Sequence, residues 1–205
     1  MARSLVEIVR QMGMTDPRLL DAVAVTPREL FVPARSADRA GRDEPLPIGH
    51  GQPTTQPSLV AQMIDALLLQ PSDTVLEIGT GYGYQTALLA HMTDRVYSIE
   101  RYPDLAVHAR ANLAAAGVAN AEVVVGDGTA GLPEHAPFDA IVVSAAAADV
   151  PTSLAEQLAE GGRLVMPITG TVADIVTMYA KRHGRLERRR SVTPAQFVPL
   201  VGKHV

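Results

Sequence analysis

The sequence predicts an α/β fold in which a doubly wound, mostly parallel sheet carries helices on both faces. Three observations indicate this fold class. Short apolar runs alternate with helix-like segments from residue 71 onward, a pattern typical of parallel sheets. A glycine-rich turn follows the first of these runs, where an open α/β sheet binds its ligand. The length of 205 residues suits one α/β domain whose core needs no disulfides.

The N-terminal segment, residues 1–70, reads as helices followed by a long loop. Asp16 followed by Pro17 is typical of a helix start, and apolar residues follow at helical spacing. Thr26 and Glu29 have the spacing of a capping box, which predicts another helix start. Residues 33–57 are rich in proline and glycine and are expected to be irregular, and a loop of this length is usually functional. A further helix is expected to begin at Pro57.

Residues 71–205 predict the Rossmann-like core. Strands are expected at residues 74–79, 95–100, 121–127, 138–145 and 163–168, and helices at residues 84–92, 103–116 and 151–160. Gly117 is expected to end the second of these helices, and Gly161 with Gly162 the third. Residues 174–182 and 185–193 flank a His-Gly turn, which predicts an antiparallel C-terminal edge. We interpret residues 1–205 as a single domain, with the N-terminal helices packed over the strand ends.

The composition excludes several classes of function. There is no cysteine, so disulfides, thiolate nucleophiles and zinc–thiolate sites are excluded. The net charge of −4 provides no overall attraction to nucleic acid or to a membrane. Residues 1–10 carry charges within any apolar run, unlike a signal peptide, and the most apolar stretch, residues 140–148, is too short to span a bilayer. We therefore expect a cytoplasmic protein with neither nucleic acid nor membrane as partner.

Three consecutive predicted strands end in residues suited to an adenosine-bearing cofactor. Gly79, Gly81 and Gly83 follow the first strand, and glycine lets a ligand approach the backbone closely. Glu100 ends the second strand, where a carboxylate accepts hydrogen bonds from ribose hydroxyls. Asp127, followed by Gly128, ends the third, where a carboxylate is able to accept from the adenine amine. Each of Glu77, Glu100 and Asp127 alone could be a solvated strand end, but the three acids together favour a cofactor site.

The residues around the glycines favour S-adenosylmethionine over a dinucleotide. A nicotinamide enzyme typically has a longer glycine pattern, because a pyrophosphate sits on the helix N-terminus. Here Tyr84 stands where a third small residue is expected. Glu77 precedes the glycines and would repel a pyrophosphate, but not a sulfonium or an amino group. The sequence thus predicts the fold of the class I S-adenosylmethionine-dependent methyltransferases.

From about residue 26 onward the chain resembles the protein-L-isoaspartate (D-aspartate) O-methyltransferases. The resemblance rests on residues 46–52, 75–87, 97–101, 126–128, 136–141, 161–165 and 197–202. It implies a monomeric enzyme that methylates the free carboxylate of isoaspartyl residues in damaged peptides and proteins. It also implies a set of residues that hold the cofactor, namely Thr54, Glu77, Gly79, Gly81, Gly83, Glu100, Arg101, Asp127 and Gly128. Val198 and Leu200 are the implied substrate contacts.

The loop departs from the family pattern at three positions. The family usually reads Gly-Gln-Thr-Ile-Ser-Gln-Pro, with the serine assigned as the active site. Here Thr55 stands at the serine, Thr54 at the isoleucine and Pro53 at the threonine. Thr55, our candidate catalytic residue, keeps a hydroxyl but is stiffer about χ1, and Pro53 lacks a backbone donor. The substitutions leave two alternatives open: methylation of a different carboxylate, in a small molecule or modified peptide, and a catalytically silent binding protein.

Methylation of a carboxylate is compatible with the side chains present. A carboxylate is already ionised at neutral pH, because its reference pKa is about 4, so it needs alignment and shelter from water rather than a base. The six histidines are scattered, and no metal site is expected. His50 lies in the loop, and we interpret it as a surface or hydrogen-bonded histidine. The arginines within residues 182–190 have no interleaved aromatic residues, which favours a solvated face over nucleic-acid binding.

Overall fold

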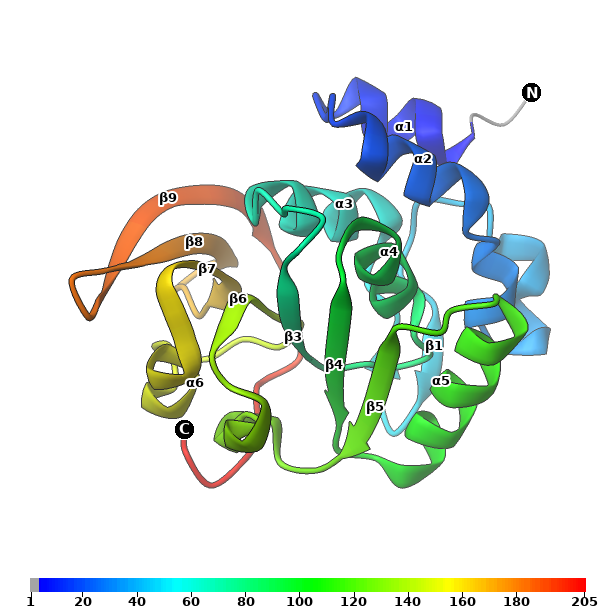
Figure 1. Ribbon diagram of the computed structural model, residues 1–205. Coiled ribbons are helices and arrows are strands. Elements are labelled where there is room, and N and C mark those ends of the chain that lie inside the picture. The colour runs from blue at the N-terminus through cyan, green and yellow to red at the C-terminus, as the bar shows by residue number, and fades with distance from the viewer. Residues whose placement is uncertain (1–3) are drawn as a thin grey trace.

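The computed structural model describes residues 4–205, which build a seven-stranded sheet with helices on both faces (Figure 1). The strand order is β5-β4-β3-β6-β7-β8-β9, with β3 to β7 parallel and the last two strands antiparallel. The strands are β3 (Thr74–Ile78), β4 (Arg95–Glu100), β5 (Ala121–Val125), β6 (Phe138–Val143), β7 (Leu158–Ile168), β8 (Asp174–Arg182) and β9 (Arg185–Ala195). The predicted fold class and its antiparallel edge are confirmed.

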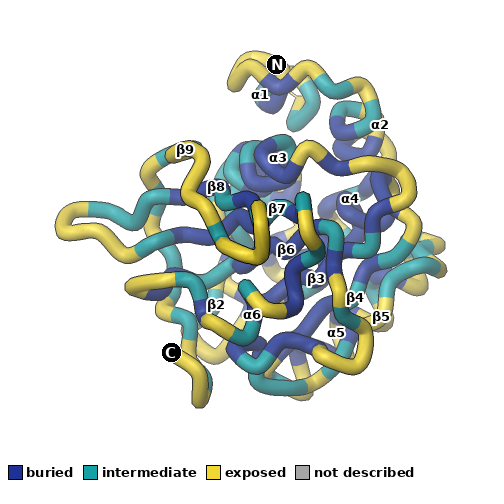
Figure 2. The backbone as a smooth tube through the Cα atoms, turned by 60° about the vertical axis from the view of Figure 1, so that its left-hand side comes forward, coloured by how far each residue is buried: buried dark blue, intermediate teal, exposed yellow. Residues whose placement is uncertain are grey.

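Both faces of the central parallel strands β3, β4 and β6 are mostly buried: successive side chains point to opposite sides, and each side is covered. Val75 packs with the helices α3 (Pro57–Ala66), α4 (Tyr84–Met92) and α5 (Pro103–Ala115) in one apolar cluster. Its neighbour Leu76 packs in a second cluster with the helix α6 (Thr152–Gln157). The central strands are buried along most of their length (Figure 2). The carboxyl ends of these strands, where the cofactor residues were predicted, border a cavity.

The N-terminal helices pack on other helices rather than over the strand ends, so that prediction is wrong. Helix α1 (Leu5–Gln11) contacts α3, and α2 (Pro17–Val25) contacts α4 (Figure 1). The cap of α2 is as predicted: the Asp16 carboxylate accepts from the Arg18 backbone N–H at 2.9 Å. Leu19 and Val23 are buried in the same apolar cluster as the sheet. This shared core supports our interpretation of one domain.

Residues 26–57 are more ordered than predicted. The capping box is not formed: Thr26 ends α2, and its buried hydroxyl has no partner among the described residues. A 3-10 turn, Arg28–Phe31, follows without any side-chain cap. A second 3-10 turn, Ala34–Arg39, leads to a short hairpin of β1 (Pro47–Gly49) and β2 (Gln52–Pro53). This hairpin reaches the strand ends, together with Phe31 and with Val60 of α3.

The helix predicted at residues 151–160 is shorter than expected. Helix α6 ends at Gln157, and β7 runs from Leu158 through both glycines. Gly161 has φ of +80°, and a Cβ at Gly162 would lie 2.8 Å from the Ala159 carbonyl oxygen. The glycines therefore form an irregularity at the start of the strand instead of stopping a helix.

Among the helices of residues 4–205, none combines the length and the apolar character that a membrane-spanning helix needs.

Candidate active site

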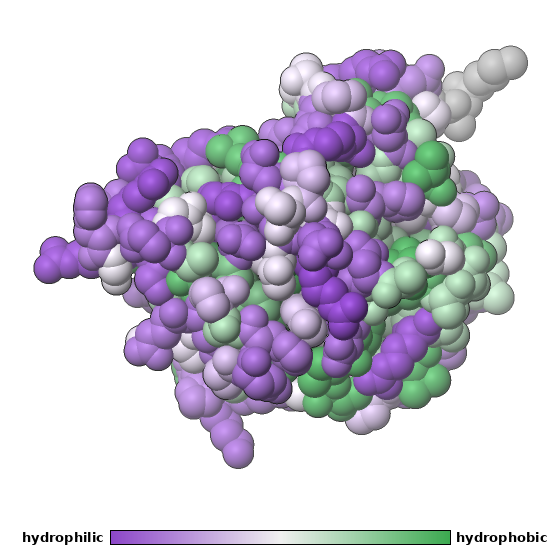
Figure 3. Space-filling model, viewed as in Figure 1, coloured by the Kyte–Doolittle hydropathy of each residue, from purple (hydrophilic) through white to green (hydrophobic). Residues whose placement is uncertain are grey.

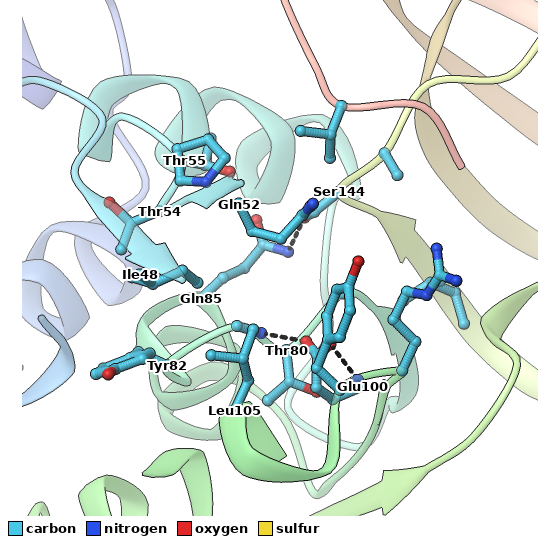
Figure 4. A pocket seen from close by; sticks show the side chains of 18 of the residues that line it. Ile48, Gln52, Thr54, Thr55, Thr80, Tyr82, Gln85, Glu100, Leu105 and Ser144 are labelled. Carbon is cyan, nitrogen blue, oxygen red and sulfur yellow. Dashed lines mark hydrogen bonds between the residues drawn. The ribbon is translucent and has the colours of Figure 1, made fainter. Parts of the chain in front are cut away.

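A cavity of about 380 Å³ opens at the carboxyl ends of β3, β4 and β6. One wall is the β1–β2 hairpin with Ile48, Gln52, Thr54 and Thr55, which Figure 4 shows opposite Glu100. The glycine turn, the start of α5 and the segment after β9 complete the wall. The volume falls within the range of about 300–1,000 Å³ typical of small-molecule sites. The predicted cofactor edge of the sheet therefore carries a cavity.

The glycine turn forms the floor of the cavity at Gly79 and Gly81. Their φ values of +96° and +58° are ones that glycine adopts without strain. A Cβ at Gly81 would lie 3.2 Å from Ile48 Cδ1, so a side chain there would press against the hairpin. Gly83 plays a different part: it precedes α4, faces Leu113 and does not line the cavity.

Glu100 ties the first two strand ends together at the cavity wall. Its carboxylate accepts from the Gly81 backbone N–H at 2.8 Å and from the Tyr102 backbone N–H at 3.0 Å. Each oxygen accepts one of these bonds, so each keeps a lone pair for a further donor. Arg101 also lines the cavity, with its guanidinium 5.2 Å from the centre of the Tyr102 ring. Both residues therefore line the cavity, and their role toward a cofactor stays a prediction.

Asp127 lies beside the cavity rather than on its wall. Its carboxylate accepts from the backbone N–H and hydroxyl of Thr129 and from the backbone N–H of Lys203. Although partial burial opposes the effect, these hydrogen bonds hold the pKa of Asp127 below its usual value. Gly128 does line the cavity, and a Cβ there would meet Ile78 Cγ2 at 2.3 Å. The structure thus shows Asp127 bonded to the C-terminal segment through Lys203, and its contact with adenine stays a prediction.

Glu77 is buried beneath the glycine turn and does not line the cavity. Its Oε2 accepts from the Thr86 and Ser98 hydroxyls, each at 2.5 Å, and its Oε1 accepts from Gln85 Nε2 at 3.0 Å. Burial raises the pKa of Glu77 to about 7, although these three hydrogen bonds favour the ionised form. The carboxylate therefore has no direct path to a ligand, and any effect on one passes through its partners.

Arg28, which sequence reasoning missed, holds the loop that carries Thr54 and Thr55. The side chain is 2% exposed and donates to the backbone carbonyls of Ala40, Arg42 and Glu44 at 2.8–3.0 Å. It also donates to the Thr54 hydroxyl at 3.1 Å. A single arginine between Pro27 and Glu29 gives no periodic or spacing signal, so the sequence alone could not have identified it.

The two threonines differ in how their hydroxyls are used. The Thr54 hydroxyl accepts from Arg28 and from the Leu46 backbone N–H, both at 3.1 Å, so it is part of the loop framework. Thr55 is half-buried and lines the same cavity, and no bond within residues 4–205 occupies its hydroxyl. Thr55 is therefore the threonine whose hydroxyl is available to a ligand.

The segment after β9 covers the site from the other side. Ala146 anchors it, accepting from the Leu200 backbone N–H at 2.7 Å and donating to the Val198 carbonyl at 2.9 Å. This pairing places Val198 and Leu200, the predicted substrate contacts, on the cavity wall. The terminal motif therefore meets the loop motif in space, although about 140 residues of sequence separate them.

A second cavity, of about 620 Å³, adjoins the first. The two share a boundary formed by Pro53, Thr54, Thr55, Ser144 and Val198. No charged side chain lines the second cavity, whose wall combines apolar residues with amides and hydroxyls. The site thus has two compartments that meet at Thr55.

No cluster of three or more potential ligands for a metal occurs in the described part of the chain. His50, at the hairpin tip, lies 2.8 Å from the Asp104 carboxylate and stacks on Tyr102. The hydrogen bond from His50 lowers the pKa of Asp104. His50 therefore joins the hairpin to the start of α5, and it does not line the first cavity.

Comparisons with known proteins agree on one family. The sequence profile of protein-L-isoaspartate (D-aspartate) O-methyltransferases matches residues 1–205. The protein-L-isoaspartate O-methyltransferase of Roseiflexus castenholzii is 48% identical over 98% of this chain and 92% of its own. That of Methanoculleus marisnigri is 49% identical over 95% and 88%, respectively. A solved protein-L-isoaspartate O-methyltransferase superposes with a TM-score of 0.86 at 28% identity, covering 98% of this chain and 66% of its own. This chain belongs to the protein-L-isoaspartate (D-aspartate) O-methyltransferase family.

Proposed function

We propose that this protein transfers the methyl group of S-adenosylmethionine to the free carboxylate of L-isoaspartyl residues in damaged peptides and proteins. The observation that carries the proposal is the pair of adjoining cavities that meet at Thr55. The cofactor would occupy the cavity above the glycine turn, and the acceptor would enter through the uncharged one. The names of the relatives support the same reaction.

The first cavity fits S-adenosylmethionine by its shape and its donor set. Gly79 and Gly81 form a cradle that side chains would fill, and Glu100 keeps lone pairs for two ribose hydroxyls. Ile99 and Leu105 supply apolar surface on the same wall. Its two charged residues are Glu100 and the neighbouring Arg101. S-adenosylmethionine held there would supply an activated methyl group, which would pass to a carboxylate oxygen as its bond to sulfur broke and left the electron pair on sulfur.

The protein's part in this reaction is to align the carboxylate and exclude water. An isoaspartyl linkage adds a methylene to the peptide backbone and leaves the α-carboxylate free, so a narrow cleft is able to recognise it by backbone geometry. The Thr55 hydroxyl would donate to this carboxylate from the hairpin, while Val198 and Leu200 would contact the peptide from the other side. We further propose that the protein acts as a cytoplasmic monomer, without nucleic acid or membrane as partner; the net charge of −4 and the resemblance to the family support this proposal.

Thr55→Val is expected to slow methyl transfer while leaving cofactor affinity nearly unchanged. Valine keeps the shape of threonine and removes its hydroxyl, and a hydrogen bond to a charged group contributes about 1.5–3 kcal/mol, or roughly 10- to 150-fold in rate. The measurement is the rate of base-labile methyl ester formation on an isoaspartyl peptide with labelled cofactor. Calorimetry with S-adenosylhomocysteine measures cofactor affinity, and Thr55→Ser, which keeps the hydroxyl, is the matched control.

Two results of this assay would contradict the proposal. A Thr55→Val enzyme as fast as the parent would show that the hydroxyl takes no part in transfer. A parent enzyme that binds S-adenosylhomocysteine but labels no isoaspartyl peptide would favour another acceptor carboxylate or a silent relative. Pro53, which lines both cavities in place of the family's threonine, would then be the first residue to revert.

A further inference from the structure

A second hydroxyl, that of Ser144, faces the boundary between the two cavities. Ser144 follows β6, and its backbone N–H donates to the Ile78 carbonyl at 2.9 Å, which fixes it at the strand end. It lines both cavities, as Thr55 does, but from the sheet side rather than from the hairpin (Figure 4). A Cβ at Gly79 would lie 3.4 Å from Ser144 Cβ, so the serine packs directly on the glycine turn. A group held at the boundary would therefore have a hydroxyl on each side.

The hydrogen-bonding partner of Ser144 leaves its proton free. Gln85 Nε2 donates to Ser144 Oγ at 3.0 Å and to Glu77 Oε1 at 3.0 Å. When Glu77 is ionised its oxygens only accept, so the bond to Glu77 then sets the orientation of the amide. Ser144 Oγ must then act as the acceptor for Gln85, and no group within residues 4–205 takes its hydroxyl proton. The hydroxyl is therefore free to donate to a group held in the cavities that Ser144 lines.

Glu77 is the buried group to which the Gln85 amide is hydrogen-bonded. The carboxylate is fully buried and its second oxygen is occupied by Thr86 and Ser98. Gln85 is itself 6% exposed, at the start of α4. Hydrogen bonds thus run from buried Glu77 through Gln85 to the Ser144 hydroxyl on the cavity wall. Buried polar partners of this kind preorganise a functional group. This arrangement accounts for an acid that the sequence places before the glycines but that touches no cavity.

We propose that Ser144 donates a hydrogen bond to the acceptor carboxylate and that Gln85, anchored on Glu77, is the residue that positions it. This inference rests on the proposed function and names a further residue of the same site. The carboxylate would be held between the Ser144 and Thr55 hydroxyls, with one oxygen left to attack. A hydroxyl that donates from a rigid strand end fixes direction better than one on a loop.

The test is the affinity of a hexapeptide with a central isoaspartyl residue for the enzyme saturated with S-adenosylhomocysteine. Ser144→Ala is expected to weaken this affinity by at least about tenfold, as befits a lost bond to a charged group. The twin hexapeptide, whose free carboxylate is converted to the amide, should lose much less. Affinity for S-adenosylhomocysteine should stay unchanged, and Ser144→Thr should restore peptide binding. Ser153→Ala, which removes a half-buried hydroxyl on α6, is the matched control.

A double-mutant cycle separates positioning from general disturbance. Gln85→Met should weaken isoaspartyl peptide binding in the parent but cause no further loss in the Ser144→Ala background, because it acts through that hydroxyl. Additive losses, or a Ser144→Ala enzyme that still distinguishes the two peptides as well as the parent, would overturn the assignment of Ser144. A parent enzyme that does not distinguish the peptides at all would instead overturn the proposed function, and this inference with it.

Discussion

Arg28→Met is expected to cause the largest loss of stability of any single change at the site. It removes four hydrogen bonds from a buried guanidinium and leaves the carbonyls of Ala40 and Glu44 without this donor, while the Arg42 carbonyl keeps only the Glu44 backbone N–H. Each unsatisfied buried group costs about 1–3 kcal/mol, so the free energy of unfolding should fall by about 3 kcal/mol or more. For a chain of this length that corresponds to a melting temperature lower by about 6–12 °C.

The same change should also remove activity in whatever protein remains folded, because Arg28 holds the Thr54 hydroxyl and thus the hairpin. Arg35→Met is the matched control, since Arg35 is exposed and donates to a single carbonyl at 3.4 Å. Thermal unfolding followed by circular dichroism measures both variants. If Arg28→Met melted with Arg35→Met and kept full activity, Arg28 would not organise the loop.

Glu100→Ala is expected to cause the largest loss of cofactor affinity. The carboxylate is 5% exposed and joins the Gly81 turn to Tyr102, and it has lone pairs left for the ribose. Losing hydrogen bonds to a charged group should cost about 1.5–3 kcal/mol, so the Kd for S-adenosylhomocysteine should rise roughly 10- to 150-fold.

Calorimetry with S-adenosylhomocysteine tests this expectation directly. Glu122→Ala is the matched control, because Glu122 lies on the neighbouring strand and its carboxylate pairs with Arg95 at the surface. It should bind as tightly as the parent. Equal affinity of Glu100→Ala and Glu122→Ala would mean that the ribose does not lie against Glu100.

The sequence predicted the parallel core well because its signals are local. Gly83 and Gly117 mark the ends of helices, and the boundaries of α4 coincide with the expected residues 84–92. The helix expected to reach Gly161 failed because glycine is compatible both with a helix end and with an irregular strand. The spacing of Thr26 and Glu29 was equally ambiguous, because Thr26 lies at the end of α2 and does not cap the turn that follows.

The site was predictable where residues act at strand ends and unpredictable where they act through long-range contacts. Glu100 and the glycine turn follow from the topology of a parallel sheet. Arg28 and Ser144 do not, because their partners lie in distant parts of the chain and neither forms a motif. Glu77 was predicted to bind the cofactor directly but is buried beneath the glycine turn, because a sequence cannot tell whether an acid points into a cavity or into the core.

The selectivity of methyl transfer is the most direct test of the central claim. The measurement compares kcat/KM for an isoaspartyl peptide with that for its aspartyl twin, which has the same residues and net charge. A carboxylate held between Thr55 of the hairpin and Ser144 at the strand end predicts transfer to the isoaspartyl peptide and little or none to the twin. Equal kcat/KM for the two peptides would contradict the account, because it would show a carboxyl methyltransferase that does not read the backbone.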